Sequence, residues 1–378
     1  MVAVSAMGKT TDQLVGLARQ VSRHPRGREY DLLLAAGEQI AVSLLALALQ
    51  DKGTPAIALT GAQSRMRTDN AFNRARIQSI DTTRILEELA QGRVVIIAGF
   101  QGVTEANEVT TFGRGGGDIT GAAVAAALKA SVCEICTDVD GVLSADPNLV
   151  PDARLWPQIS YEEAIEMASS GAKVLHPRAA EICMSFGIPI HVRSSFHLRS
   201  GTWIRQGVPE MEQPLVVGVT GDRKISKVTL FGVPDRPGIA ADVFKDLADR
   251  DIAIRLIIQS AANEALARIT FILDDDMADR ADELIQVWKD KGIAKDGLVE
   301  RHVAKIAIVG SRLASTPGLA ARMFAALAGE GINIDCITSS EMKVACVIAA
   351  DQLDVAIKAV HREFFGESQQ ASQVKVGA

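Results

Sequence analysis

The sequence has few aromatic residues, no strong excess of either charge and no secretory leader. Aromatic side chains make up 4% of the 378 residues, so Ala, Val, Ile and Leu must fill the core. A net charge of −6 offers no basic surface, so we expect no nucleic-acid partner. We find no run of eighteen apolar residues and no basic-then-apolar leader. We therefore expect no membrane partner and a cytoplasmic location.

Cysteine is also scarce. The chain has five cysteines, an odd number, which suits reduced thiols better than a disulfide framework. Cys133 and Cys136 form a CxxC pair, a spacing that is compatible with zinc or redox chemistry. No second pair and no histidine cluster follows, and the pair lies in a strand-like run. We therefore interpret both as core cysteines and expect no metal site on the protein.

The length and the alternation of elements indicate the class of fold. A chain of 378 residues predicts two or three domains. Apolar strands alternate with helices up to about residue 206, which predicts an α/β domain whose parallel or mixed sheet is covered on both faces. Residues 207–213 are polar and are interpreted as a linker.

The C-terminal part contains an internal repeat. Residues 227–260 match residues 305–340, each with a strand, a Pro-Gly turn, an amphipathic helix and a strand. A repeated unit of roughly 75 residues predicts two copies of one small domain, because a solenoid needs at least about three repeats. The second copy lacks a last strand. We expect residues 214–219 to fill that place, with the first copy inserted within the second.

The stretch from Thr111 to Lys129 combines a strand end, a glycine run and an alanine-rich helix. The glycines at 115–117 let backbone amides approach a ligand, and Asp118 is the predicted N-cap of the helix. The amino end of a helix favours an anion, and the Arg114 guanidinium suits a carboxylate or a phosphate. Taken alone, the stretch fits either a ligand site or a flexible loop capped by an ordinary Asp.

The loop after the first predicted strand, Val2–Val4, is a second candidate. Ser5, Gly8, Lys9, Thr10 and Thr11 follow that strand and resemble a ligand-binding loop. The alternative is a capped helix start, with Thr10 or Thr11 as the cap.

A carboxylate in an apolar helix is a third candidate. Residues 30–49 predict a long helix that is interrupted at AAGEQ, because Gly37 is unfavourable inside a helix. Glu38 follows in apolar surroundings, as a partnered core charge or as a ligand contact. We favour the ligand contact, because lone buried carboxylates are costly.

Acidic residues follow the strand predicted at 134–137. Asp138 and Asp140 lie just past its carboxyl end, where open α/β sheets bind ligands, although an Asp-Gly turn is the alternative. The loop that ends at Asp146-Pro147 favours a nucleotide site. Lys173 is either a surface lysine or a phosphate contact.

These motifs, in this order, resemble bacterial aspartate kinase, of the amino-acid kinase family, with two C-terminal ACT domains. The resemblance covers nearly the whole chain and rests on VSAMGKTTD, GEQ, RTDNAFNRARI, AGFQG, GRGGxD, TDVDGV, VLHPRAAEI, PIHVRSSF and VPDRPG. It implies a three-layer αβα kinase domain with a mostly parallel sheet, followed by two ferredoxin-like (βαββαβ) ACT domains. The implied bounds are 1–206 for the kinase, 207–213 for the linker, 221–300 for the first ACT domain, 214–220 plus 301–368 for the second, and 369–378 for a polar tail.

The resemblance also implies an activity. Such enzymes transfer the γ-phosphoryl of ATP, with Mg²⁺, to the β-carboxylate of L-aspartate, at the entry to lysine, threonine and methionine synthesis. An end-product amino acid (threonine and/or lysine) binds the ACT pair and inhibits, and a homodimer is expected. The implied residues are Asp118 for the transfer site; Thr11, Glu38, Arg114, Gly115 and Gly116 for aspartate; Thr137, Asp138, Gly141, Val142, Asp146, Pro147 and Lys173 for ATP; and Asp235, Gly238, Gln259, Ser339 and Ser340 for the effector.

The chain departs from the family pattern at several places. The family's first strand carries Lys-Phe-Gly-Gly, a motif that is not found here, and one explanation is a wrongly chosen start codon. Gly117, Cys136, Leu143 and Asn148 stand where the family has Ser, Tyr, Tyr and Arg. Two hypotheses follow: a working aspartate kinase, or a non-catalytic homologue that binds an amino acid through its ACT domains and associates with itself or with an active kinase.

Overall fold

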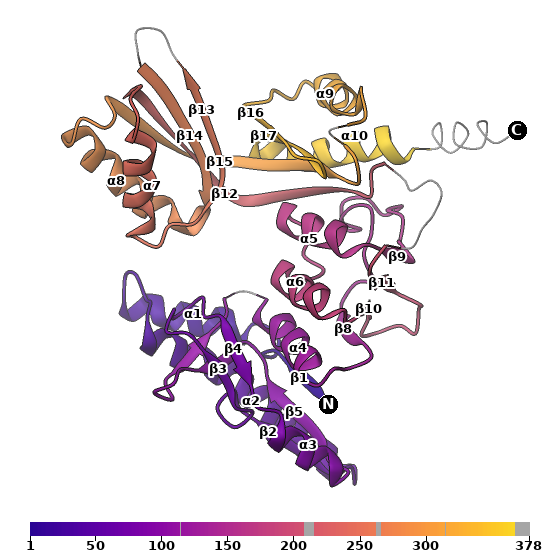
Figure 1. Ribbon diagram of the computed structural model, residues 1–378. Helices are drawn as coiled ribbons and strands as arrows, with labels where there is room; N and C mark the ends of the chain where they lie inside the picture. The colour runs from indigo at the N-terminus through magenta and orange to yellow at the C-terminus, as the bar shows by residue number, and fades with distance from the viewer. Residues whose placement is uncertain (114, 208–214, 262–265, 314, 367–378) are drawn as a thin grey trace, which may run out of the picture. The chain divides into compact units, whose positions relative to one another are not determined.

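A computed structural model describes residues 1–113, 115–207, 215–261, 266–313 and 315–366 (Figure 1). Their contacts divide the chain into two compact units. Unit 1 comprises Met1–Val142, Leu155–Ser169 and Lys173–Glu210, and unit 2 comprises Leu143–Arg154, Ser170–Ala172 and Met211–Ala378. Residues 208–213 of the expected linker and the expected tail at 369–378 lie outside the described residues.

The strands of unit 1 form three sheets. The first has the order β1-β5-β2 and is entirely parallel, with β1 (Val2–Val4), β5 (Val94–Ala98) and β2 (Ala56–Leu59). The second has the order β8-β10-β11-β9, with β8 (Cys133–Thr137), β10 (Ile190–Ser194), β11 (Thr202–Ile204) and β9 (Gln158–Ile159), and only the pair β10-β11 is antiparallel. The third has the order β4-β3-β6-β7, with β4 (Ile77–Ile80), β3 (Met66–Thr68), β6 (Gln101–Val103) and β7 (Val109–Thr111).

Helices cover both faces of the parallel strands. Unit 1 contains α1 (Thr10–Val21), α2 (Arg28–Asp51), α3 (Thr83–Ala90), α4 (Gly116–Ala127), α5 (Tyr161–Ser170) and α6 (Pro177–Phe186). Side chains alternate along β5, so Ile96 packs with Val42 of α2 while Ile97 packs with Ile85 of α3 and Ile119 of α4. The strand is therefore apolar throughout, and the predicted layered α/β class is confirmed.

Helix α2 runs without the predicted interruption. A Cβ atom at Gly37 would lie 3.0 Å from the Ala6 Cβ, so glycine here allows close packing of the loop after β1 and leaves the helix intact. By length and composition, α2 is the one helix in the described part of the chain that could cross a membrane, which the search for apolar runs did not predict. Its buried face carries Asp31 and Glu38 and packs on β2 and β5.

The alternative considered for the start of α1, a cap at Thr10 or Thr11, is not observed. The N-cap position is Lys9, and neither Thr10 nor Thr11 caps the helix. The Thr10 hydroxyl instead donates to the Met7 carbonyl at 2.7 Å, which leaves the amino end of α1 without a side-chain cap.

Unit 2 is built around two long strands that serve both repeats, and Figure 1 shows them running from the orange to the yellow part of the sheet. They are β12 (Gly218–Pro234) and β15 (Asp296–Val309), in a six-stranded sheet of order β13-β14-β12-β15-β17-β16. The other strands are β13 (Ile254–Ala261), β14 (Leu266–Asp274), β17 (Lys343–Ala349) and β16 (Cys336–Ser339). The start of β12 pairs with the end of β15, from Gly218 opposite Val309 to Asp222 opposite Lys305.

Each repeat buries its own core. The first packs α7 (Ile239–Ala248) and α8 (Ala278–Asp290) around Phe271 and Trp288, and the second packs α9 (Leu319–Gly329) and α10 (Leu353–Phe365) around Ile348 and Val360. Short 3-10 turns, Asp275–Met277 and Ala350–Gln352, precede α8 and α10. The two ferredoxin-like repeats are confirmed.

Candidate active site

Three loops of unit 1 meet where β1 and β5 end. The Gly99 amide donates to the Val4 carbonyl at 2.9 Å, and the Phe100 amide donates to the Gly116 carbonyl at 3.2 Å. A Cβ atom at Gly99 would lie 3.0 Å from the Gly117 Cα, so glycine at position 99 allows this close approach of the loops. The carboxyl ends of parallel strands are where open α/β sheets bind ligands.

Glu38 lies at this junction with one oxygen unused. The residue is 3% exposed, and its Oε1 accepts a hydrogen bond from the Ala6 amide at 3.0 Å. Its Oε2 is buried and has no hydrogen-bond partner among the described residues. Burial raises the pKa of Glu38, and the Ala6 hydrogen bond opposes the rise. A buried, half-satisfied carboxylate favours the predicted ligand contact, and a cationic group would complete it.

The glycine run begins α4 earlier than predicted. Gly115 is the N-cap, in the left-handed region with φ +74°, and Gly116 and Gly117 are already helical. Asp118 is therefore the third residue of the helix, and its prediction as N-cap was wrong. Its Oδ2 accepts from the His176 amide at 3.0 Å, and burial raises its pKa. Arg114 lies outside the described residues, and Thr11 is half-buried in the first turn of α1.

His176 and Arg178, at the amino end of α6, hold the glycine loop, and sequence reasoning assigned a role to neither. His176 caps the helix, with Nδ1 accepting from the Arg178 amide at 3.1 Å, and burial lowers its pKa to about 4. A side chain at Gly115 would meet the His176 ring. The Arg178 guanidinium donates to the carbonyls of Phe112 (3.2 Å) and Ala75 (3.1 Å). The available signal was a His before Pro at a helix start.

Asp31 is a second carboxylate on α2 that sequence reasoning missed. It is fully buried, and it accepts from the amides of Asn73 and Thr111, both at 2.8 Å, and from the Thr111 hydroxyl at 2.6 Å. The Asn73 side-chain amide is a fourth donor. Burial raises the pKa of Asp31, and these hydrogen bonds oppose the rise. Asp31 lies seven residues before Glu38, about two turns away on the same helix face, which was the available signal.

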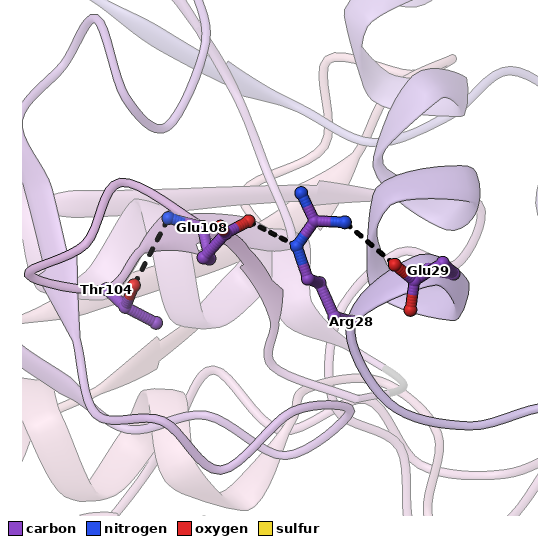
Figure 2. A network of polar contacts seen from close by, with 4 residues as sticks. All are labelled: Arg28, Glu29, Thr104 and Glu108. Carbon is purple, nitrogen blue, oxygen red and sulfur yellow. Dashed lines mark hydrogen bonds and ion pairs between the residues drawn. The ribbon is translucent and has the colours of Figure 1, made fainter.

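The start of α2 is tied to the turn between β6 and β7. Figure 2 shows Arg28, whose Nη1 donates to Glu29 at 2.7 Å and whose Nε donates to Glu108. The Glu108 amide donates to the Thr104 hydroxyl at 3.1 Å. Arg28 of α2 binds Glu108, just before β7, and Asp31 of α2 binds Thr111, the last residue of β7. Helix α2 therefore holds both ends of the strand that leads into the glycine loop.

The residues predicted for ATP fall in both units. Thr137 ends β8 and donates to the exposed Asp138 at 3.1 Å. Gly141 and Val142 are buried in unit 1, where the Val142 amide donates to the Thr202 hydroxyl at 2.9 Å, and Lys173 is exposed in the same unit.

Asp146 and Pro147 belong to unit 2. They lie in the segment Leu143–Arg154, where Asp146 Oδ1 accepts from the Asn148 amide at 2.9 Å. The segment is anchored by Ser144, whose hydroxyl lies 2.9 Å from His361 Nε2 of α10. Ala145 and Val150 join the core of the second repeat.

The residues predicted for the effector are accessible. Asp235, Gln259, Ser339 and Ser340 are all exposed. Gly238 is the N-cap of α7, with φ +95° and no side-chain cap, so backbone amides of the first turn are left without a capping group.

The interpretation of the cysteine pair was half right. Cys133 is buried, whereas Cys136 is exposed. The two residues are three positions apart on β8, so they point to opposite faces of the sheet.

Comparison with known proteins shows the family. The amino acid kinase family model matches residues 1–194, and two ACT-domain models match residues 227–292 and 306–364. An aspartokinase of Geobacillus stearothermophilus is 44% identical over 376 residues, which covers 99% of this chain and 91% of that protein. Aspartokinase 2 of Bacillus subtilis is 43% identical over 365 residues, which covers 96% and 89% of the two chains.

A solved structure is similar over the same extent. Aspartokinase III of E. coli, in complex with aspartate and ADP, matches with a TM-score of 0.80 and 28% identity, over 94% of this chain and 80% of that one. The chain therefore belongs to the amino acid kinase family, as an aspartokinase that carries two ACT domains.

Proposed function

We propose that the protein transfers the γ-phosphoryl group of ATP to the β-carboxylate of L-aspartate, giving 4-phospho-L-aspartate and ADP. The observation that carries this proposal is the unused, buried oxygen of Glu38 beside the glycine-lined amino end of α4. An amino-acid substrate has the matching groups: an ammonium for the carboxylate, and carboxylates for the helix amides. E. coli aspartokinase III was solved with aspartate and ADP, which supports the same pair of ligands here.

Each predicted site residue has a role in this proposal. Glu38 binds the substrate ammonium, while Thr11, Arg114 and the amides of Gly115 and Gly116 bind its carboxylates. Asp118, held by the His176 amide, organises the transfer site. Phosphoryl transfer depends on positioning and on neutralisation of charge, so fixed amides and cations are the groups it needs.

The nucleotide is assigned to the residues that follow β8. Thr137, Asp138, Gly141, Val142, Asp146, Pro147 and Lys173 are proposed to hold ATP. Mg²⁺ neutralises charge on the phosphates when it is bound, and it usually keeps water and phosphate ligands with one or two carboxylates. Among the described residues, no group of three or more His, Cys, Asp or Glu side chains is placed to hold a metal ion.

We assign feedback control, at the entry to lysine, threonine and methionine synthesis, to the ACT pair. Asp235, Gly238, Gln259, Ser339 and Ser340 are the proposed effector residues, for threonine or lysine. The structure of E. coli aspartokinase III with lysine and aspartate supports an amino-acid effector.

We also propose that the protein is a cytoplasmic homodimer that associates through its ACT sheets. β13 and β16 are the two edges of the six-stranded sheet, and they expose Ile257 (50%) and Ile337 (49%). Edge strands of this kind present unpaired backbone groups to a partner strand.

The test is aspartate-dependent ADP release by the purified chain, beside a version extended upstream by a strand with Lys-Phe-Gly-Gly. Turnover by either one that requires aspartate supports the proposal. Absence of turnover in both, with a thermal shift induced by threonine or lysine, supports instead a regulatory homologue that binds amino acids. One observation favours that alternative: Asn148, at a position where the family has Arg, turns its side-chain amide onto Asp146 at 3.0 Å.

A further inference from the structure

The loop that carries two of the residues proposed for ATP, Asp146 and Pro147, is closed and attached at Ser144. The Ser144 amide donates to the Arg154 carbonyl at 2.9 Å, and the Arg154 amide donates to the Ser144 hydroxyl at 2.8 Å. The Ser144 carbonyl accepts the Val219 amide of β12 at 2.7 Å. Ser144 is therefore the residue at which the two ends of the loop meet and at which the loop joins the sheet of unit 2.

His361 of α10 completes the hydrogen bonds of the Ser144 side chain. Its Nε2 lies 2.9 Å from the Ser144 hydroxyl oxygen, and both residues are buried, at 5% and 0% exposed. A hydroxyl has one proton to donate. Because this hydroxyl already accepts the Arg154 amide, the imidazole nitrogen is the acceptor for its proton among the described residues. Burial lowers the pKa of His361, opposed by Asp152, which favours the neutral ring that can accept.

The His361 ring is itself held in place. It stacks on the Phe365 ring, one turn further along α10, with the ring centroids 4.7 Å apart. The end of α10 is tied to α9, because the Arg322 guanidinium donates to the Glu363 carboxylate at 2.7 Å and to the Glu363 carbonyl at 2.9 Å. The acceptor for the Ser144 hydroxyl thus belongs to a helix that is fixed in the second repeat.

The tip of the loop is a compact turn that depends on its attachment. The Asp146 carbonyl accepts the amides of Leu149 and Val150 at 3.0 and 2.9 Å, and Asp146 Oδ1 accepts the Asn148 amide at 2.9 Å. These bonds fix the shape of the turn, but they do not join it to another element. Its place relative to the rest of unit 2 is set by the buried side chains of Ala145 and Val150 and by the hydrogen bonds at the base of the loop.

We propose that His361 is a positioning residue for the nucleotide: by accepting the Ser144 hydroxyl it fixes the loop that presents Asp146 and Pro147 to ATP. The assignment rests on the proposed function. The imidazole does not touch the nucleotide, and it acts through a hydrogen bond between residues 217 positions apart in the chain. Its loss should therefore weaken the binding of ATP and leave the binding of aspartate unchanged.

The test breaks this hydrogen bond from each side, in the form of the chain that turns over. His361→Leu is expected to raise KM for ATP about tenfold, because the buried hydroxyl loses its acceptor and the loop its attachment, with KM for aspartate unchanged. Ser144→Ala should have a similar effect, and the double variant should be no worse than Ser144→Ala alone. His361→Gln keeps a polar group near the Nε2 position and should stay within about threefold of the parent. The Val150 amide should exchange faster in His361→Leu than in the parent.

Ile332→Val is the control for a loss of stability alone. Ile332 is 5% exposed in the core of the same repeat, and this change should lower the thermal midpoint by roughly 2–4 °C with the parent KM for ATP. Calorimetry with ATP gives the same comparison as Kd, so a parent that binds ATP without turnover still tests the assignment. An unchanged affinity for ATP in His361→Leu, or an equal loss in Ile332→Val, would overturn the assignment while the proposed function stands. Absence of both ATP binding and aspartate turnover in the parent would overturn both.

Discussion

The two units differ in how a buried charged side chain is paired. In unit 1, Glu38 has one oxygen on the Ala6 amide and one with no partner among the described residues. In unit 2, Lys227 is 9% exposed and its ammonium lies 2.9 Å from Glu300 and 3.1 Å from Asp335. Burial lowers the pKa of Lys227, but the two carboxylates outweigh burial and raise it. A half-satisfied buried charge indicates a place for a ligand, whereas a fully paired one indicates a structural role.

The largest effect is expected from Glu38→Gln. Loss of the charge would remove the proposed partner of the substrate ammonium, so kcat/KM for aspartate should fall about 100-fold, roughly 3 kcal/mol. Stability should hold or rise, because an uncompensated buried charge disappears. ADP release and denaturant midpoints measure the two quantities, and Glu87→Gln, on the exposed face of α3, is the control. An unchanged kcat/KM would make Glu38 a core charge, no different in kind from Lys227.

Asp31→Asn tests whether position on α2 alone makes a carboxylate functional. Asp31 accepts from four donors, and an amide would turn an NH₂ group toward some of them. We expect a loss of about 3 kcal/mol in the free energy of unfolding of unit 1, because buried donors are left unpaired. Urea denaturation measures the loss. Full stability together with a raised KM for aspartate would contradict this structural role.

Lys227→Met should produce a smaller loss in unit 2. Glu300 and Asp335 would keep their charges without a cation, but their side chains are 35% and 33% exposed, so we expect about 1–2 kcal/mol. Neutralising both carboxylates as well, by Glu300→Gln and Asp335→Asn, should restore most of the loss. Hydrogen exchange of β12 amides reports the change. Equal stability of the single and triple variants would show that the carboxylates left without a cation are not the cause of the loss.

The last effect is confined to acid pH and concerns His176. Its pKa is about 4 in the folded protein, below the value of about 6.5 expected in the unfolded chain. The neutral ring therefore contributes stability above pH ~6.5 that is lost as the pH falls toward ~4. His176→Asn keeps an N-cap acceptor but removes the titration, so its midpoint should change less with pH over that range. Parallel pH profiles for parent and variant would contradict this.

Local sequence patterns predict much of the fold and of the candidate site, and the rest depends on contacts between segments that are distant in the sequence. The apolar run at β5, the glycine loop before α4 and the repeat of unit 2 all carry local signals that predict the fold. Glu38 was identifiable because a carboxylate in an apolar helix is costly. Gly37 predicted a break that did not occur, because its neighbour Ala6 lies 31 positions earlier in the chain. The Ser5 hydroxyl oxygen lies 2.1 Å from the place that a Cβ atom at Gly117 would take. This contact joins segments over 100 residues apart, which no local pattern encodes.

One feature of the chain path bears on how the protein can be dissected. Two short segments, Leu143–Arg154 and Ser170–Ala172, leave unit 1 and are bound by β12: the Val219 amide donates to the Ser144 carbonyl at 2.7 Å, and the Thr220 hydroxyl donates to the Ser170 carbonyl at 3.2 Å. A fragment that stops near residue 206 would keep both segments but lose β12, which binds them. Ala145 and Val150 would then be exposed, because the core of the second repeat, in which they are buried, would be absent. Each unit contains separate stretches of the chain, so no single cut would separate an intact unit 1 from an intact unit 2.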